Sequence, residues 1–377
     1  MINITFPKLR DDWSLDVVNI LAFLGEHNIL ACSQQICMTW TCLLPRLIPA
    51  PQGLLAQRPK KLDSEDDVPV NGVHTGNGRP GLSYVGRMIH TDGSELPPCT
   101  TRVIKIRWTS KNTDGSFRKA PLRPRLFSPI NIIAIFSCGL SFGLAAWAIM
   151  LGDAVALTGI LVMSFTTPLL CVGMRWRPGF PIPSRNYAGS PRGTVVVKSA
   201  NGCFTVVECD EDVARLLYFH PDKIDYAVSS FTGRGLSGTV GGLTLVGSIV
   251  LFGNAVWTMK AALAVTYTVL NLCYWIAAIL PLRLSWHIDL EIDPPQIIEH
   301  ETYTRCVWTT IYITKKIDWA RNHVPNSDVW DQWLGEAQRM AGTVQEPGDW
   351  DAQGAIVEIL TEKSKRTGKT NGKGSVM

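Results

Sequence analysis

The sequence lacks the short motifs that mark most nucleotide-binding and catalytic proteins. Its glycine-rich stretch at residues 231–242 matches neither the P-loop nor the dinucleotide-binding pattern, so we predict a hinge there. The candidate general bases are histidines on polar segments, and none has a neighbouring nucleophile or carboxylate pattern that specifies a reaction. They are His90, His220, His287, His300 and His323. We therefore predict no catalytic residue and no cofactor, and an enzyme is the least favoured function class.

Cysteine is present, but not in a pattern that holds a metal or a disulfide framework. Cys32, Cys37 and Cys42 recur at a spacing that matches neither CxxC zinc sites nor one face of a helix. The other cysteines lie in apolar blocks or on segments that we expect to face the cytosol, so we predict free thiols. Residues 1–12 contain several charges and no uninterrupted apolar run, so a cleaved secretory signal is not expected.

Long apolar runs are confined to two blocks. Residues 128–174 form the first, broken only by Gly152-Asp153, and residues 240–282 form the second, broken only by Met259-Lys260. Each block is long enough for two helices of about 20 residues, the length that crosses a hydrocarbon core of about 30 Å. The predicted fold class is therefore a mainly α membrane protein with four transmembrane helices as two hairpins. We expect these helices at residues 128–151, 154–174, 240–258 and 261–282.

Charged residues are missing from the interiors of these spans, since Asp153 and Lys260 fall at the predicted turns. Proton pumps and ion-coupled carriers usually place ionisable groups at depth, so this absence disfavours transport. The polar residues near the midplane are predicted to hydrogen-bond within the bundle, and a polar pore or substrate contact is the alternative. This midplane polar layer consists of Ser141, Ser164, Ser248 and Asn271.

One pair of glycines in the first span predicts close helix packing. Gly139 and Gly143 form a GxxxG pair, which lets another helix backbone approach closely in lipid. We predict packing against a helix of the same chain, and self-association into a homo-oligomer is the alternative.

Basic residues are distributed unevenly around the spans. The formal net charge is +4, and Lys and Arg crowd residues 102–125 and 175–198, whereas the predicted turns contain only Lys260. By the positive-inside rule, both termini and the central segment face the cytosol. The bases nearest the first span are predicted to contact anionic headgroups of the lipid bilayer. They are Arg118, Lys119, Arg123 and Arg125. A nucleic-acid partner is not expected.

The polar segment before the first block divides into three regions. Residues 1–48 are predicted to be an amphipathic helical segment, with a helix over residues 14–44 that stops before Pro45; a fifth span over residues 28–44 is the alternative. Residues 49–101 are rich in Pro, Gly, Ser and Asp, and they are predicted to be a disordered linker. Residues 102–127 form a basic juxtamembrane segment.

The remaining polar segments predict smaller folded elements. Residues 175–239 contain a predicted cytosolic ββα insert, in which two β-branched runs meet at Asn201-Gly202 and Asp210 caps a short helix. Residues 283–362 are predicted to be a cytosolic helical region rich in tryptophan, and residues 363–377 a disordered basic tail.

Three runs of sequence resemble uncharacterised multi-pass membrane proteins of filamentous fungi. They are PSRNYAGSPRGT at residues 183–194, ECDEDVARLLYF at residues 208–219 and VWTMKAALAVTY at residues 256–267. The resemblance covers about residues 102–319. It implies a eukaryotic membrane protein and brings no assigned activity, so no functional residue is carried over from it.

These observations favour a structural or adaptor membrane protein. Its docking surfaces for protein partners would be the ββα insert and the tryptophan-rich C-terminal helices. An oligomeric channel or small-solute permease is the alternative, supported by the midplane polar layer and the GxxxG pair. The sequence specifies neither the organelle nor the partner.

Overall fold

The structure is a computed structural model, and it describes residues 25–55, 58–90, 96–109, 122–177, 191–199 and 201–371. The chain divides into two compact units, each assembled from three stretches of sequence. The helical unit comprises residues 1–62, 122–179 and 223–288. The sheet unit comprises residues 63–121, 180–222 and 289–377. Both apolar blocks therefore belong to the helical unit.

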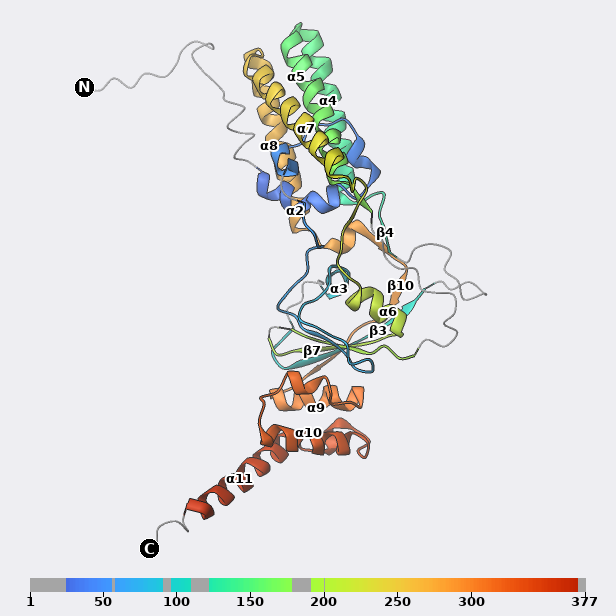
Figure 1. Cartoon of the computed structure of the whole chain (residues 1–377), viewed down its shortest axis with the longest axis vertical. Coiled ribbons are helices and arrows are strands. Elements are labelled where there is room, and N and C mark those ends of the chain that lie inside the picture. The colour runs from blue at the N-terminus through green and yellow to red at the C-terminus, as the bar shows by residue number, and fades with distance from the viewer. Residues whose placement is uncertain are drawn as a thin grey trace, which may run out of the picture. The chain divides into compact units, whose positions relative to one another are not determined.

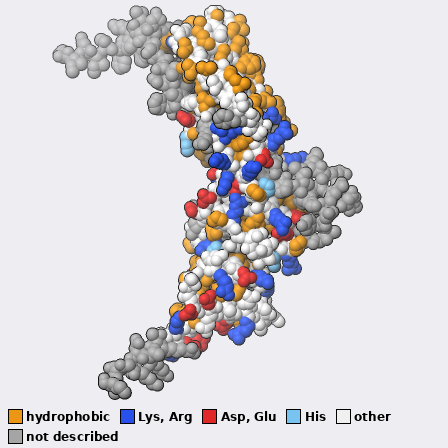
Figure 2. Space-filling view, viewed as in Figure 1, with side chains coloured by type: hydrophobic (Ala, Val, Ile, Leu, Met, Phe, Trp, Pro, Cys, Tyr) orange, Lys and Arg blue, Asp and Glu red, His pale blue; other side chains and the backbone are white. Residues whose placement is uncertain are grey.

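Four long apolar helices form the bundle of the helical unit (Figure 1). They are α4 (Pro129–Leu151), α5 (Ala154–Met174), α7 (Phe231–Gly253) and α8 (Trp257–Ile279). All four are long and apolar enough to cross a membrane. Hydrophobic side chains cover the bundle on the face shown in Figure 2, as lipid contact requires. The prediction of four helices of this length and composition is confirmed.

Local sequence sets the ends of the first hairpin. The hydroxyl of Ser128 accepts a hydrogen bond from the N–H of Asn131 and caps α4, and Gly152 ends that helix with a φ of 68°. The carboxylate of Asp153 caps α5 by accepting from the N–H groups of Val155 and Ala156. Its other oxygen accepts from the N–H of Val256 at 2.8 Å, in the turn between α7 and α8. One aspartate thus ties the two hairpins together at this end.

The second hairpin differs from the sequence prediction at its helix ends. α7 begins at Phe231, inside the glycine-rich stretch predicted as a hinge, rather than at residue 240. The turn falls at residues 254–256 rather than at Met259-Lys260, so Lys260 lies in the first turn of α8. The hydrogen bond from the N–H of Val256 to Asp153 holds this turn in place. Hydropathy along the chain does not predict such a tertiary contact.

Glycines pack the bundle, but not the pair that the sequence predicts. A Cβ built at Gly159 on α5 would lie 2.9 Å from the ring of Phe252 on α7, and one at Gly241 would lie 2.3 Å from Leu170. A Cβ at Gly139 or Gly143 would meet nothing within 4 Å. The close approach within this chain is therefore between α5 and α7. It uses isolated glycines that no GxxxG pattern marks.

The N-terminal segment packs on the bundle as short helices. The described part contains α2 (Glu26–Ile36), η2 (Trp40–Leu43) and η3 (Pro51–Leu55). At 1.5 Å per residue, α2 is about 16 Å long, too short to cross a hydrocarbon core. The expected helix over residues 14–44 therefore ends at Ile36 within its described part, and a fifth span over residues 28–44 is not formed.

Short strands complete the helical unit near the polar helix ends. β4 (Leu122–Pro124) pairs with β9 (Trp286–Ile288), and β5 (Trp176–Arg177) pairs with β8 (Asp225–Tyr226). A short 3₁₀ helix, η5 (Leu282–Ser285), leads from α8 into β9.

The sheet unit is built on β3 (Thr100–Trp108). β3 runs parallel to β7 (Phe204–Glu208) at one edge, and its other edge pairs with β10 (Leu290–Ile292) and then β11 (Gln296–Glu299). Beyond β7 the order continues through β6 (Val195–Lys198), β1 (Val70–Gly72) and β2 (Gly78–Arg79). Each of the three polar stretches of the unit thus contributes strands to one sheet.

Helices cover the two faces of this sheet (Figure 1). On one side lie α3 (Tyr84–His90), α6 (Glu211–Ala214) and the π-helical turn η4 (Arg215–Phe219). On the other side α9 (Tyr303–Thr314) packs on β3 and β7, followed by η6 (Ala320–Asn322), α10 (Asp328–Ala341), η7 (Pro347–Asp349) and α11 (Ala352–Asn371).

Several segments expected to be separate or disordered are parts of this sheet unit. The predicted linker at residues 49–101 contains β1, β2 and α3, and the predicted juxtamembrane segment at residues 102–127 contains most of β3. The β6–β7 hairpin lies inside the sheet rather than in an isolated insert. The predicted tail from residue 363 continues α11 as far as Asn371. Strand pairing between distant segments supplies the order that local composition does not.

The tryptophans of the C-terminal helices are used in the core. Trp308 and Trp333 are buried, and their indole N–H groups donate to the carbonyls of Pro347 and Ala352. Trp350 packs between them, with ring centroids 4.5 Å from Trp308 and 5.8 Å from Trp333. These rings hold α9, α10 and α11 together, and a docking surface on these helices stays a prediction.

The two kinds of glycine in the bundle give a matched test. Gly159→Ala places a methyl group against the buried ring of Phe252, and we expect a loss of about 1–3 kcal/mol in unfolding free energy from overpacking. Gly139→Ala meets no atom, so we expect no loss. Thermal unfolding of both variants in detergent measures the difference. Equal stability of the two variants would contradict the α5–α7 contact.

Candidate functional site

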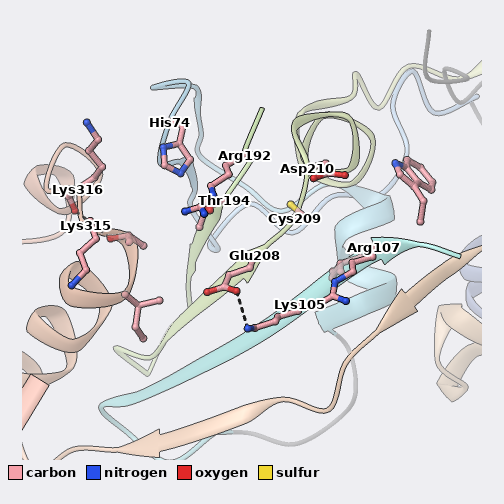
Figure 3. A pocket seen from close by; sticks show the side chains of 14 residues that line it. His74, Lys105, Arg107, Arg192, Thr194, Glu208, Cys209, Asp210, Lys315 and Lys316 are labelled. Atoms are coloured by element: carbon pink, nitrogen blue, oxygen red, sulfur yellow. Dashed lines mark hydrogen bonds and ion pairs between the residues drawn. The ribbon is translucent and has the colours of Figure 1, made fainter. Parts of the chain in front are cut away.

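A basic pocket lies on the sheet unit beside the C-terminal end of α9 (Figure 3). Its volume is about 900 Å³, within the usual range of ligand pockets. Ile104 and Ile106 of β3 are buried, and the alternating residues Lys105 and Arg107 lie on the opposite face of the sheet. Because α9 ends at Thr314, this part of the face is left uncovered and forms the floor of the pocket.

Positive charge dominates the lining. Two bases come from β3, one precedes β6 and two follow α9, so elements far apart in the sequence supply them. The five basic side chains are Lys105, Arg107, Arg192, Lys315 and Lys316, against the acidic side chains Glu208 and Asp210. Figure 3 shows Lys315 and Lys316 at one end of the pocket and Arg107 at the other, with His74 and Arg192 between.

Three of these five bases already form ion pairs or other polar contacts within the sheet unit. The Nζ atom of Lys105 lies 3.3 Å from a carboxylate oxygen of Glu208, and Arg107 lies 3.6 Å from Asp293. Lys315 donates to the carbonyl of Ala341 and lies over the ring of Tyr312, 3.6 Å from its centroid. Within the described ranges, Lys316 and Arg192 form no ion pair. The pocket therefore keeps an excess of positive charge for a ligand.

The pocket holds no nucleophile–base pair. The thiol of Cys209 donates to the carbonyl of Gly193 at 3.3 Å, and burial raises its pKa, so it stays protonated. No group of three or more His, Cys, Asp or Glu that could hold a metal occurs among the described residues. The excess of basic side chains in the lining suits the binding of an anionic group.

Two of the histidines considered as general bases are used in packing. The Nε2 atom of His90 lies 2.8 Å from the hydroxyl of Tyr218, and that of His323 lies 2.7 Å from the amide nitrogen of Asn71. Burial, with a nearby arginine, lowers the pKa of His90 to about 3. Burial and the charge of Lys198 lower the pKa of His323 to about 4. Both rings are therefore neutral at pH 7.

Three of the four residues of the predicted midplane polar layer form side-chain hydrogen bonds within the helical unit, and their common depth in a membrane stays a prediction. Ser141 donates to the carbonyl of Ser137, and Ser248 donates to that of Thr244. Asn271 accepts from the side-chain amide of Asn28 at 3.1 Å, and Ser164 makes no side-chain hydrogen bond. None of the four residues bonds to another of the four. Their partners are their own helices and the N-terminal segment, whose insertion the sequence does not signal.

The residues predicted to contact lipid headgroups are only partly described. Arg118 and Lys119 lie outside the described residues. Arg123 lies in β4, paired with β9, and Arg125 is exposed, with its backbone N–H donating to the carbonyl of Ser285. The headgroup contact stays a prediction.

The structure also reveals a buried charge that the sequence analysis misses. Arg46 follows η2 and is fully buried in the helical unit. Its backbone N–H donates to the carbonyl of Ser164 in the middle of α5, and the next residue, Leu47, donates to the hydroxyl of Ser141. A count of charges within the spans overlooks Arg46, because it enters the bundle from outside them.

Basic composition alone does not predict the pocket. Lys105 and Arg107 belong to a run rich in bases, but their alternation with Ile104 and Ile106 is the pattern of a strand with one polar face. The pocket residues after α9, Lys315 and Lys316, carry no such signal.

Comparison with protein-family models, with curated proteins and with solved structures finds no match to this chain. The resemblance to fungal multi-pass membrane proteins therefore stays a prediction.

The partly buried histidine beside Asn71, His323, predicts a pH-dependent stability. The pKa of His323 is about 4 in the folded chain, below the ordinary value of 6.5, so the unfolded chain takes up the proton first. The contribution of neutral His323 to the free energy of unfolding is complete above pH 6.5 and is lost as the pH falls toward 4. Allowing for the partial exposure of the ring, we expect a loss of about 2 kcal/mol.

Unfolding free energies of the wild type and His323→Asn, measured between pH 7.5 and 4, test this effect. The variant should lose less stability over that range. His74→Asn, which changes an exposed histidine, should follow the wild type. Parallel profiles for the wild type and His323→Asn would contradict a neutral, partly buried His323.

Proposed function

We propose that this protein is a membrane-anchored adaptor whose sheet unit docks an acidic segment of a cytosolic protein partner. The four helices of the bundle serve as the anchor. The basic pocket of the sheet unit is the docking site, and it is the observation that carries the proposal.

The pairing within the sheet supports an orientation with both termini in the cytosol. Strands from before the first hairpin, from between the hairpins and from after the second hairpin belong to one sheet. A bilayer does not divide a hydrogen-bonded sheet, so the three stretches would share one side of the membrane. Bases are concentrated in these stretches, whereas the opposite ends of the hairpins carry only Asp153 in one turn and Lys260 in the first turn of α8, so the shared side would be the cytosol.

The distribution of charge in the pocket favours an extended ligand with several negative charges. Its bases lie at both ends of the pocket and between them, rather than converging on one point (Figure 3). Arg107 is 68% exposed, so it can reach a ligand in solvent. A run of Asp and Glu side chains in a partner matches this spacing better than one small anion would. Complementary charge of this kind steers association and sets specificity.

A charge-reversal experiment on the full chain in nanodiscs tests the pocket. The probe is a fluorescent hexaglutamate peptide, whose binding is measured by anisotropy. We expect the double variant Arg107→Glu and Lys316→Glu to weaken binding by about tenfold or more, because each change replaces an attraction by a repulsion. Added salt should weaken binding to the wild type.

The control is Arg339→Glu, which reverses one exposed arginine on α10 that does not line the pocket. It should leave the affinity for the peptide within about twofold of the wild type. Equal weakening in both variants would show that only overall charge matters, and it would overturn the docking site.

An oligomeric channel or permease is the second candidate. The observation that favours it is the exposed position of Gly139 and Gly143, since none of the residues that the structure describes packs there and a second copy would fit. Proteoliposomes containing the pure protein provide the test. Solute flux that disappears in Gly139→Leu, together with a smaller particle mass, would favour this candidate over the adaptor.

A further inference from the structure

Arg46 is a buried cation, and no carboxylate side chain lies among its electrostatic neighbours to balance its charge. It is 0% exposed, and its Nη1 atom donates to the carbonyl of Thr41. Its Nε and Nη2 atoms have no hydrogen-bond partner. No Asp or Glu forms an ion pair with Arg46 among the described residues of the unit. Since arginine does not lose its proton in proteins, the charge needs a counter-charge.

The groups around the guanidinium are donors or weak acceptors. Its electrostatic neighbours are the hydroxyl of Tyr274 and the thiols of Cys37, Cys42 and Cys171, all of them buried. The hydroxyl of Tyr274 interacts with the guanidinium of Arg46, and no other described group forms a hydrogen bond with it. Burial raises the pKa of the Cys42 thiol to about 11, so this thiol is neutral at pH 7. The cluster therefore offers several N–H and O–H donors, and its acceptors are neutral hydroxyl and thiol groups rather than a carboxylate.

The backbone around Arg46 is fixed, so the side chain cannot simply turn to solvent. Hydrogen bonds join Arg46 to Ser164 on α5 and Leu47 to Ser141 on α4. The guanidinium interacts with Cys171, two helical turns from Ser164 and about 10 Å farther along α5. An unpaired ion at such a position destabilises the folded chain, and a bound anion offsets that destabilisation.

We propose that Arg46 and the hydroxyl of Tyr274 bind a small inorganic anion inside the helical unit. The two unpaired guanidinium nitrogens, Nε and Nη2, lie on the same edge of the group, and such an edge presents parallel N–H donors to one anion. Because Arg46 and Tyr274 are fully buried, we take the smallest common inorganic anions, chloride and nitrate, as the candidate occupants.

The test measures thermal unfolding of the full chain in nanodiscs at constant ionic strength. Sodium chloride or sodium nitrate replaces sodium gluconate, whose anion is too large for an enclosed site. For the wild type, each tenfold rise in chloride or nitrate above the dissociation constant should raise the folding equilibrium constant about tenfold. No difference among the three salts would overturn the proposal.

Two variants locate the effect. Arg46→Met should abolish the dependence on chloride and nitrate, and a retained dependence would overturn the assignment to Arg46. Tyr274→Phe removes only one hydroxyl, so it preserves the fold and should shift the anion midpoint at least threefold. Its matched control is Tyr267→Phe on the same helix, since the hydroxyl of Tyr267 is also buried and unpaired but is not a neighbour of Arg46. Equal shifts in the two tyrosine variants would contradict the site.

The competing counter-charge is a thiolate within the pair formed by Cys37 and Cys171, which are hydrogen-bonded to each other. Under that explanation the wild type would not respond to anions, and Cys171→Ala would create a response. That result would overturn the proposal. An unchanged response in Cys171→Ala would support it.

Discussion

The pairing of β3 on both of its edges is the constraint on which the rest of the structure depends. β3 lies before the first hairpin, β7 between the hairpins, and β10 and β11 after the second. Backbone groups in the middle of a sheet are buried and must be paired, so β3 needs partner strands on both of its edges. Both hairpins consequently begin and end at the sheet unit. Any arrangement in a membrane must let the chain leave that unit and return to it twice.

The parts of the fold that sequence predicts well are those with local causes. Hydropathy marks α4, α5, α7 and α8, since each helix satisfies its own backbone and carries its apolar residues within one continuous run. The sheet has no such local cause. β1 has three residues and β2 has two, and each is specified by a partner strand. The composition of residues 49–101 therefore suggests disorder, although distant pairing makes part of this segment a sheet edge.

The candidate site is harder still to predict, because charge by itself does not indicate position. Lys105 and Lys316 lie more than 200 residues apart in the chain, and folding brings both to one pocket. Arg46 shows the reverse case, since a search of the spans for charges finds none, while the chain inserts one from a segment outside them. In both cases the helix ends and strand register decide where the charge lies.

Burial separates the two sets of cations by their physics. The bases of the pocket are exposed to solvent, so counter-ions screen them and their interaction with a ligand depends on ionic strength more than on the identity of the salt. Arg46 is out of reach of that screening, and its interaction depends on which ion fits beside the guanidinium. The proposed roles of the two sets of cations differ accordingly. The bases of the pocket would bind a charged partner at the surface of the sheet unit. Arg46 would contribute to the stability of the helical unit through the anion bound beside its guanidinium.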